Sequence, residues 1–263
     1  MSAILLDERI VHYEVLGRGR PIIFLHGWVG SWRYWVPAMQ VAAISFRAYA
    51  LDLWGFGDTA HDPVLYPLEQ QVNLLDRFIQ EMGMGKVALV GHGLGALTAI
   101  LFAKKYPQVV DRLMAVNVPM SGQLVANRLR SPASPADLAD WLLGKGPITE
   151  PARTDAPKAD PLAITDSFRS LNDTDFISIM DAMATPCLIV HGQADPAIRT
   201  LEYERFVSMS NQVHQVVLED SGHFPMLDES PRFNRLMTDF LALISGDSPR
   251  ELQLKEEWKR RVR

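Results

Sequence analysis

The chain has 263 residues, of which 48% are hydrophobic and 22% charged, and this is the composition of a globular protein with a sizeable core. Its formal net charge of −5 provides no basic surface for nucleic acid and no reason to expect an anionic membrane as a partner. Cys187 is the single cysteine, which excludes an internal disulfide and a cysteine-based metal site. The first residues lack the pattern of a secretory signal, so we expect a cytoplasmic protein.

Apolar runs bounded by glycine, proline or polar residues predict strands, and apolar residues at helical spacing predict helices. In the first half of the chain they predict a hairpin of residues 4–6 and 10–16, strands at 22–25, 47–51, 87–90 and 113–118, and helices at 32–43, 68–82 and 94–105. The nearly uncharged stretch 87–103 contains His92 and three closely spaced glycines. We interpret it as a buried strand, a tight turn and a buried helix, because these glycines would interrupt a membrane-spanning helix.

The alternation stops between residues 120 and 182, a stretch that contains six prolines. We expect short helices at 136–143 and 162–170 and a loose segment at about 144–161. Since long inserts in compact domains are usually functional or disordered, we interpret this one as a cap over the carboxyl edge of the sheet. The alternation then resumes, with predicted strands at 187–190 and 215–218 and predicted helices at 201–209 and 231–243.

Strict alternation of strands and helices predicts an α/β fold, in which a mostly parallel twisted sheet carries helices on both faces. We therefore divide the chain into a core of residues 1–119 and 183–247, a cap insert at 120–182 and a helical tail at 248–263. In the tail, Leu254, Trp258 and Val262 recur at four-residue spacing, which predicts that the tail packs on its own domain or forms a homodimer.

Four short segments at the ends of predicted strands carry chemistry. They are His26-Gly27-Trp28, Asp52-Leu53-Trp54-Gly55-Phe56-Gly57, Gly91-His92-Gly93-Leu94-Gly95, and the pair Asp195 and His223. In this chain order they resemble the α/β-hydrolase superfamily over roughly residues 4–243. The resemblance implies an α/β-hydrolase fold, a nucleophile elbow at Gly91–Gly95, a catalytic acid at Asp195 and a catalytic base at His223.

The nucleophile position departs from the family, because residue 93 is glycine. The resemblance implies an oxyanion hole made by the backbone amides of Trp28 and Leu94, which do not depend on that side chain. Removal of the serine from a triad lowers turnover by on the order of 10⁶ and leaves about 10³–10⁴ over water. Dehalogenase and epoxide-hydrolase chemistry are excluded as well, since both need aspartate at this position.

Aromatic residues gather on the loops expected at the mouth of a pocket. Trp54, Phe56 and His92 are candidates for the substrate pocket, together with the Trp28 side chain. We interpret His26 as a hydrogen-bonded structural residue. The seven histidines of the chain show no metal-binding spacing, and we expect no metal and no other cofactor.

Three functions are open at this point. The favoured hypothesis is a hydrolase-type pocket for a small apolar ester- or carbonyl-containing compound, with His223 and Asp195 acting on a water held beside Gly93. The alternative is a pseudo-hydrolase that binds a small molecule without catalysis. The glycine segment also fits a dinucleotide fingerprint, yet the next strand ends at Val116-Asn117-Val118 without the acid that such a site needs.

Glycine at position 93 has two explanations. It is a natural variant, favoured because glycine is relaxed in the positive-φ turn of an elbow, or it is an engineered inactivation of a serine hydrolase. In either case we expect a small polar void beside His223.

Overall fold

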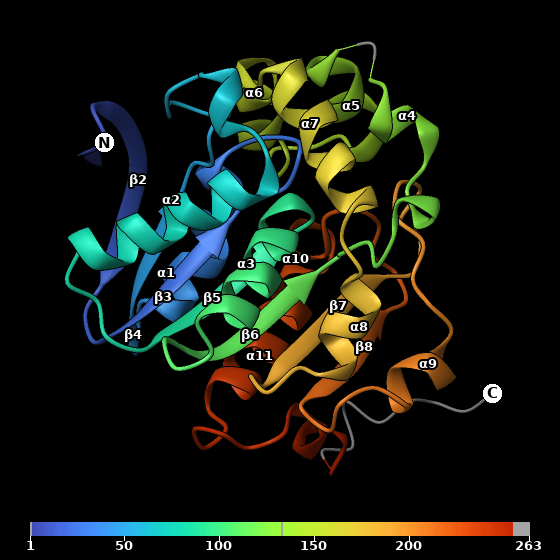
Figure 1. Cartoon of the computed structure of the whole chain (residues 1–263). Coiled ribbons are helices and arrows are strands. Elements are labelled where there is room, and N and C mark those ends of the chain that lie inside the picture. The colour runs from blue at the N-terminus through green and yellow to red at the C-terminus, as the bar shows by residue number, and fades with distance from the viewer. Residues whose placement is uncertain (1, 133, 255–263) are drawn as a thin grey trace.

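The computed structural model describes residues 2–132 and 134–254 and contains an eight-stranded sheet in the order β1-β2-β4-β3-β5-β6-β7-β8 (Figure 1). The strands are β1 Ser2–Leu6, β2 Arg9–Gly17, β3 Arg20–Leu25, β4 Phe46–Leu51, β5 Val87–His92, β6 Val110–Val116, β7 Cys187–Gly192 and β8 Val213–Leu218. β2 pairs antiparallel with β1 and β4, whereas all pairs from β4 to β8 are parallel. The predicted mostly parallel α/β fold is confirmed.

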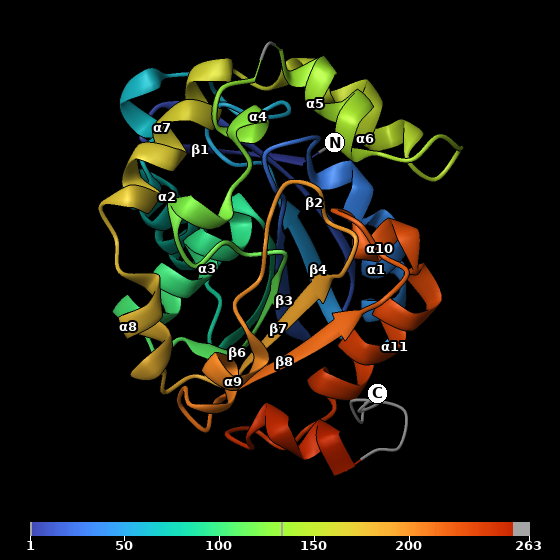
Figure 2. The same cartoon turned by 90° about the vertical axis from the view of Figure 1, so that its right-hand side faces the viewer.

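Helices cover both faces of this sheet, with α1 and α11 on one side and α2, α3 and α8 on the other (Figures 1 and 2). The helices that follow the core strands are α1 Val36–Ala42, α2 Leu68–Glu81, α3 Leu94–Lys105, α9 Tyr203–Val207, α10 Pro225–Asp228 and α11 Ser230–Leu241. Those between β6 and β7 are α4 Asn127–Arg130, α5 Pro135–Leu142, α6 Glu150–Asp155, α7 Pro161–Asn172 and α8 Phe176–Asp181. Short 3-10 helices are η1 Trp32–Trp35, η2 Pro63–Leu65, η3 Gly122–Leu124, η4 Ala156–Lys158 and η5 Pro249–Leu254.

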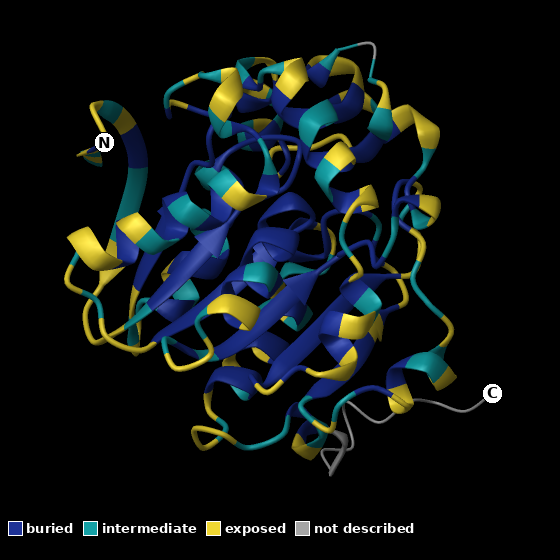
Figure 3. Cartoon of the chain, viewed as in Figure 1, coloured by how far each residue is buried: buried dark blue, intermediate teal, exposed yellow. Residues whose placement is uncertain are grey.

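The sheet's central strands form the core. Every residue of β5 and β7 is buried, as expected for parallel strands that are covered on both faces (Figure 3). α3 follows β5 and is buried around most of its circumference, while α2 and α11 keep an exposed polar side. No helix within the described ranges is long and apolar enough to cross a membrane.

The helix expected at 32–43 forms as two pieces, η1 and α1. Pro37 lies in the first turn of α1, where its missing N–H needs no intrahelical acceptor. In the middle of one continuous helix the same proline would remove a hydrogen bond. The α-helix therefore begins at Val36, and the residues before it take the tighter 3-10 geometry.

Residues 120–182, here called the insert, pack on the loops that follow β3 and β4, and α4–α7 lie together at one end of the molecule (Figure 1). The prediction that 144–161 is loose is wrong for its second half, which forms α6 and η4. Pro151 and Pro157 begin these helices, and Ala152 and Ala156 are fully buried. These two prolines thus lie in the first turns of helices and do not interrupt them.

A buried carboxylate attaches the insert to the loop after β3. Asp155 Oδ2 accepts hydrogen bonds from Ser31 Oγ at 2.5 Å and Arg33 Nε at 2.9 Å, and Lys158 Nζ lies 3.2 Å from Oδ1. Burial by itself raises the pKa of Asp155, but these donors outweigh it and the pKa is lowered. The carboxylate is therefore ionised and held by its partners.

The tail begins with η5, a 3-10 helix within the segment that was expected to be helical. Trp258 and Val262 lie outside the described residues, so packing or dimerisation through the tail stays a prediction.

We expect Asp155→Asn to lower the free energy of unfolding by about 1–3 kcal/mol, the range for hydrogen bonds to a charged group. The amide keeps the size of the side chain but loses the negative charge that Arg33 faces. Urea unfolding followed by circular dichroism measures the change. Asp140→Asn is the matched control, because Asp140 is 76% exposed in its pair with Arg153 and should change stability by less than about 1 kcal/mol. Equal effects of the two variants would contradict the prediction.

Candidate active site

A glycine-rich elbow connects β5 to α3. Gly93 has φ 48° and ψ −108°, in the positive-φ region that favours glycine, and it precedes the first residue of α3. A Cβ built at Gly91 would lie 2.4 Å from the carbonyl oxygen of Gly95, and one at Gly95 would lie 2.4 Å from that of Leu25. These close backbone contacts place the start of α3 directly against the end of β3.

Asp195 and His223 lie together at the ends of β7 and β8. Asp195 Oδ2 is 2.8 Å from His223 Nδ1, and both side chains are fully buried. The other carboxylate oxygen accepts hydrogen bonds from the amides of Ala197 and Ile198 at 2.7 and 3.1 Å. Burial raises the pKa of Asp195, but His223 and the two amides outweigh it and the pKa is lowered. An ionised Asp195 accepts a hydrogen bond from the Nδ1–H group and fixes the orientation of the imidazole.

Main-chain contacts hold the two loops that carry this pair. A Cβ at Gly192 would lie 2.0 Å from the carbonyl oxygen of Gly222, so only glycine permits this approach. Asn117, at the end of β6, donates from Nδ2 to the carbonyl oxygen of His223 at 2.9 Å and accepts from Gly192 N at 2.8 Å. In the sequence, Asn117 was noted only because it stands at the end of a strand where a dinucleotide site would need an acidic residue. Its amide, at the end of a parallel strand, was the signal for a loop-positioning residue.

His92 is a structural residue behind His223. Its Nε2 is 2.8 Å from the carbonyl oxygen of His223, which can only accept, so Nε2 carries the proton. Its Nδ1 then accepts from the Tyr34 hydroxyl at 3.0 Å, and that hydroxyl accepts from Gly27 N at 2.7 Å. Burial lowers the pKa of His92 well below 6.5, so the ring is neutral. Both ring nitrogens are engaged, and the role of His92 in a substrate pocket stays a prediction.

The second ring nitrogen of His223 has a different environment. Nε2 is buried and makes no hydrogen bond to any described residue. The imidazole lies 4.8 Å, centroid to centroid, from that of His92, the residue before Gly93. A buried nitrogen without a partner is unfavourable by about 1–3 kcal/mol, and at the end of β8, beside Asp195, it is a nitrogen that a ligand or water can use.

The side chain of Trp28 occupies the space beside Gly93. A Cβ at residue 93 would lie 2.7 Å from Trp28 Cζ3 and 2.9 Å from Cε3, closer than real contacts of this kind. The indole is fully buried. The expected polar void beside Gly93 is therefore wrong, because an aromatic ring fills the place into which a side chain at 93 would project.

The loop of Trp28 also lies close to the elbow through its backbone. The same Cβ position would be 3.6 Å from Gly27 Cα, and Gly95 N donates to His26 O at 3.0 Å. The first amides of a helix have no intrahelical acceptor, which leaves Leu94 N at the positive end of α3. An oxyanion hole built from the amides of Trp28 and Leu94 stays a proposal.

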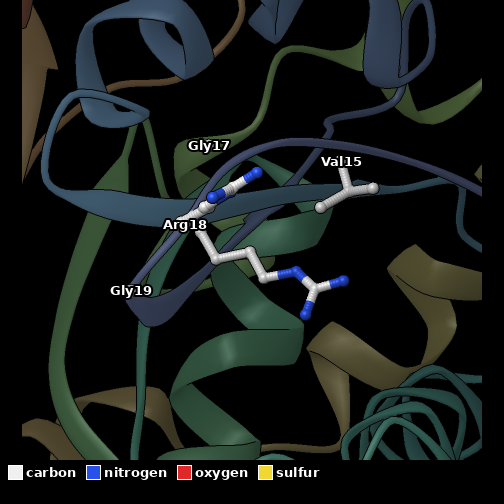
Figure 4. A pocket seen from close by; sticks show the side chains of 5 residues that line it. Val15, Gly17, Arg18 and Gly19 are labelled. Atoms are coloured by element: carbon white, nitrogen blue, oxygen red, sulfur yellow. The ribbon is translucent and has the colours of Figure 1, made fainter.

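The remaining pocket candidates are enclosed. Trp54 is 5% exposed and Phe56 fully buried, and both backbone groups of Trp54 are held by the Gln71 side chain. Surface hollows occur elsewhere. One of about 430 Å³ lies between the turn after β2 and the start of β4, where Arg18 is among the lining residues (Figure 4). It is at the amino end of β4, whereas the dyad lies at the carboxyl ends of β7 and β8.

A second cluster of histidine and aspartate side chains has the spacing of a possible metal site. His12, Asp52 and Asp58 bring possible ligand atoms within 4.8 Å of one another. Asp52 Oδ2, however, accepts from His12 Nδ1 at 2.9 Å, and Asp52 Oδ1 accepts from Trp32 N at 2.8 Å. Asp58 Oδ1 pairs with Lys158 at 3.0 Å. His12 Nδ1, both oxygens of Asp52 and Oδ1 of Asp58 thus already have partners, and these hydrogen bonds link β2, the segments after β3 and β4, and the insert.

The chain belongs to the alpha/beta hydrolase family, whose model matches residues 22–236. A similar protein is the 2-hydroxy-6-oxo-6-(2'-aminophenyl)hexa-2,4-dienoic acid hydrolase of Metapseudomonas resinovorans, 23% identical and aligned over 88% of this chain and 87% of that protein. An esterase from Exiguobacterium antarcticum has a TM-score of 0.81 at 18% identity, covering 92% of this chain and 99% of its own.

A further structural neighbour is a serine-to-glycine mutant of the N-acyl homoserine lactonase AidH, complexed with N-hexanoyl homoserine lactone. Its TM-score is 0.78 at 17% identity, covering 91% of this chain and 96% of that chain. At these identities the structural neighbours establish the fold alone. The superfamily expected from the motifs is confirmed.

Acidification should destabilise the protein. Burial lowers the pKa of four histidines below the ordinary 6.5, and these are His26, His92, His191 and His214. Between the lowered pKa values and 6.5 the unfolded chain binds more protons than the folded one, so stability falls as pH falls, by about 1.4 kcal/mol per pH unit for each such proton. We expect a lower Tm at pH 5 than at pH 7, measured by differential scanning calorimetry.

His92→Gln should make this pH dependence shallower, because glutamine can still donate to the carbonyl oxygen of His223 but does not titrate. His61→Gln, at an exposed position, is the matched control and should keep the original slope. The raised pKa of His12 has the opposite effect, which is confined to pH above 6.5. A Tm that does not change between pH 5 and pH 7 would contradict the assignment of these rings as neutral.

Proposed function

We propose that the chain binds a small ester- or other carbonyl-containing compound and hydrolyses it by general-base activation of water, without a covalent intermediate. The observation that carries the proposal is the His223 imidazole, which Asp195 holds at 2.8 Å through Nδ1 while Nε2 is buried and without a protein partner. A base held in this way is suited to accept a proton from water.

The proposed reaction uses His223 as the base and the amides of Trp28 and Leu94 as the oxyanion hole. Nε2 of His223 accepts a proton as the water oxygen bonds to the carbonyl carbon, and the carbonyl electrons move to its oxygen. The amides of Trp28 and Leu94 stabilise that oxyanion, at the positive end of α3. The intermediate then collapses, and His223 returns its proton to the leaving oxygen to give an acid and an alcohol. A general base contributes about 10²–10⁴ in rate, so we expect turnover far below that of a serine hydrolase.

The alternative function is a non-catalytic binding protein. The observation that favours it is the indole of Trp28 beside Gly93, in the space where a nucleophile would project. The AidH mutant with glycine in place of a serine is complexed with a lactone, which supports ligand binding by this fold without that serine. The ligand class that we propose is the same for both functions. The two functions differ in whether water attacks the bound ligand.

The test is hydrolysis of a panel of p-nitrophenyl esters and N-acyl homoserine lactones by the unaltered chain. For any compound turned over, His223→Ala should lower kcat by about 10²–10⁴, and Asp195→Asn should lower it as well because the imidazole loses its orienting acceptor. His61→Ala is the matched control and should leave kcat unchanged. Turnover that survives His223→Ala would overturn the mechanism, and a rise in Tm with a panel compound that is not turned over would support the binding protein.

A further inference from the structure

The indole of Trp28, which lies beside Gly93 of the elbow, is attached to the insert by a hydrogen bond and a ring stack. Its Nε1 donates to Ser167 Oγ at 2.8 Å, and Ser167 Oγ donates in turn to the carbonyl oxygen of Ile164 at 2.6 Å. Its ring stacks on Phe168 with centroids 4.7 Å apart and planes 21° from parallel. Trp28 belongs to the core, and Ser167 and Phe168 belong to α7. The ring is therefore the point where the insert and the elbow meet.

Glycine at 93 is what allows the ring to lie there. A methyl group at this position would overlap Cζ3 and Cε3, and the indole cannot retreat without breaking the bond to Ser167 or the stack on Phe168. The two residues fit as a pair, in which a small residue at 93 accommodates a large one at 28. The positive φ explains why glycine is favoured in the elbow. The contact with the indole of Trp28 explains why a larger residue is excluded.

A ligand's carbonyl group needs the same space. For the amides of Trp28 and Leu94 to face a carbonyl oxygen, the reacting group must lie next to residue 93, where the indole now is. The loop of Trp28 contains a positive-φ glycine, Gly30 with φ 89°, two residues further on. Trp28 itself lies outside β3, which ends at Leu25.

We propose that Trp28 is a gate. Its indole closes the site in the unliganded protein, in the space a nucleophile side chain would need, and it leaves when a ligand enters, which breaks its contacts with Ser167 and Phe168 of α7. Opening the site and loosening the insert are then one event. The gate rests on the proposed function in one respect, because it concerns the same site. Its tests do not require catalysis by the unaltered chain.

A double-mutant cycle of Gly93→Ala and Trp28→Ala tests the contact. The strain of alanine at positive φ is common to both backgrounds and cancels. We expect Gly93→Ala to reduce the folding equilibrium constant at least roughly tenfold more with Trp28 present than in the Trp28→Ala background, as overpacking a buried ring does. Effects that agree within about twofold would overturn the proposal, since the ring would then not occupy this space.

A second experiment leaves both Gly93 and Trp28 unaltered. Diethyl pyrocarbonate modifies unprotonated imidazole, and peptide mass spectrometry reports the rate at His223. Ser167→Ala removes one hydrogen bond from the closed gate and should speed modification of His223 roughly fivefold, the change that one such bond makes to an opening equilibrium. Ser170→Ala, one turn along α7, is the matched control and should leave the rate unchanged, with exposed His61 as the internal standard. Equal rates in the two serine variants would overturn the gate.

The nucleophile variants separate this proposal from the function. Gly93→Ser with Trp28→Ala should hydrolyse p-nitrophenyl acetate at least tenfold faster than Gly93→Ser alone, because only the double variant has room for the hydroxymethyl group. Equal rates would overturn the gate. Coupling in the stability cycle together with an unaltered chain that hydrolyses no ester would retain the gate and refute the proposed catalysis.

Discussion

Close packing of α3 against the carboxyl ends of β3 and β5 is the constraint on which the site depends. A Cβ at Gly95 or Gly91 would approach a backbone carbonyl oxygen to 2.4 Å, so no other residue type is tolerated there. The contact fixes the first turn of α3 relative to the loop after β3. The positions of the Trp28 backbone and of the Leu94 amide next to residue 93 follow from this backbone packing, whereas the Trp28 ring is held by Ser167 and Phe168.

The dyad is positioned by the same kind of constraint further along the same edge of the sheet, after β7 and β8. Gly192 lets the loop after β7 touch the loop after β8, and the Asn117 side chain bonds to both. His92 adds a neutral donor to the carbonyl oxygen of His223. Asp195 and His223 are thus held by groups that take no part in the proposed chemistry, as catalytic side chains generally require.

Position 93 combines a positive-φ backbone with a bulky neighbour. Its φ of 48° lies in the region that favours glycine, and the space into which a side chain would project contains an indole. His223 is bonded to Asp195 through Nδ1, whereas its Nε2 is buried without a partner among the described residues, which is unfavourable to stability.

The sequence by itself determined the fold and the identity of the pair at its centre. Strands and helices alternate with strong apolar patterns, and parallel strands bring their carboxyl ends to one edge. The pairing of Asp195 with His223 was implied by the resemblance of the motifs to the α/β-hydrolase superfamily, and the structure places the two side chains 2.8 Å apart. The sequence did not determine the order within 144–161, because the buried partners of Asp155 come from the loop after β3, more than a hundred residues away. Nor could it show that Trp28 fills the space beside Gly93. That contact depends on Ser167 and Phe168, which only tertiary packing brings to the elbow, since side chains distant in sequence share a cavity according to shape and not to spacing.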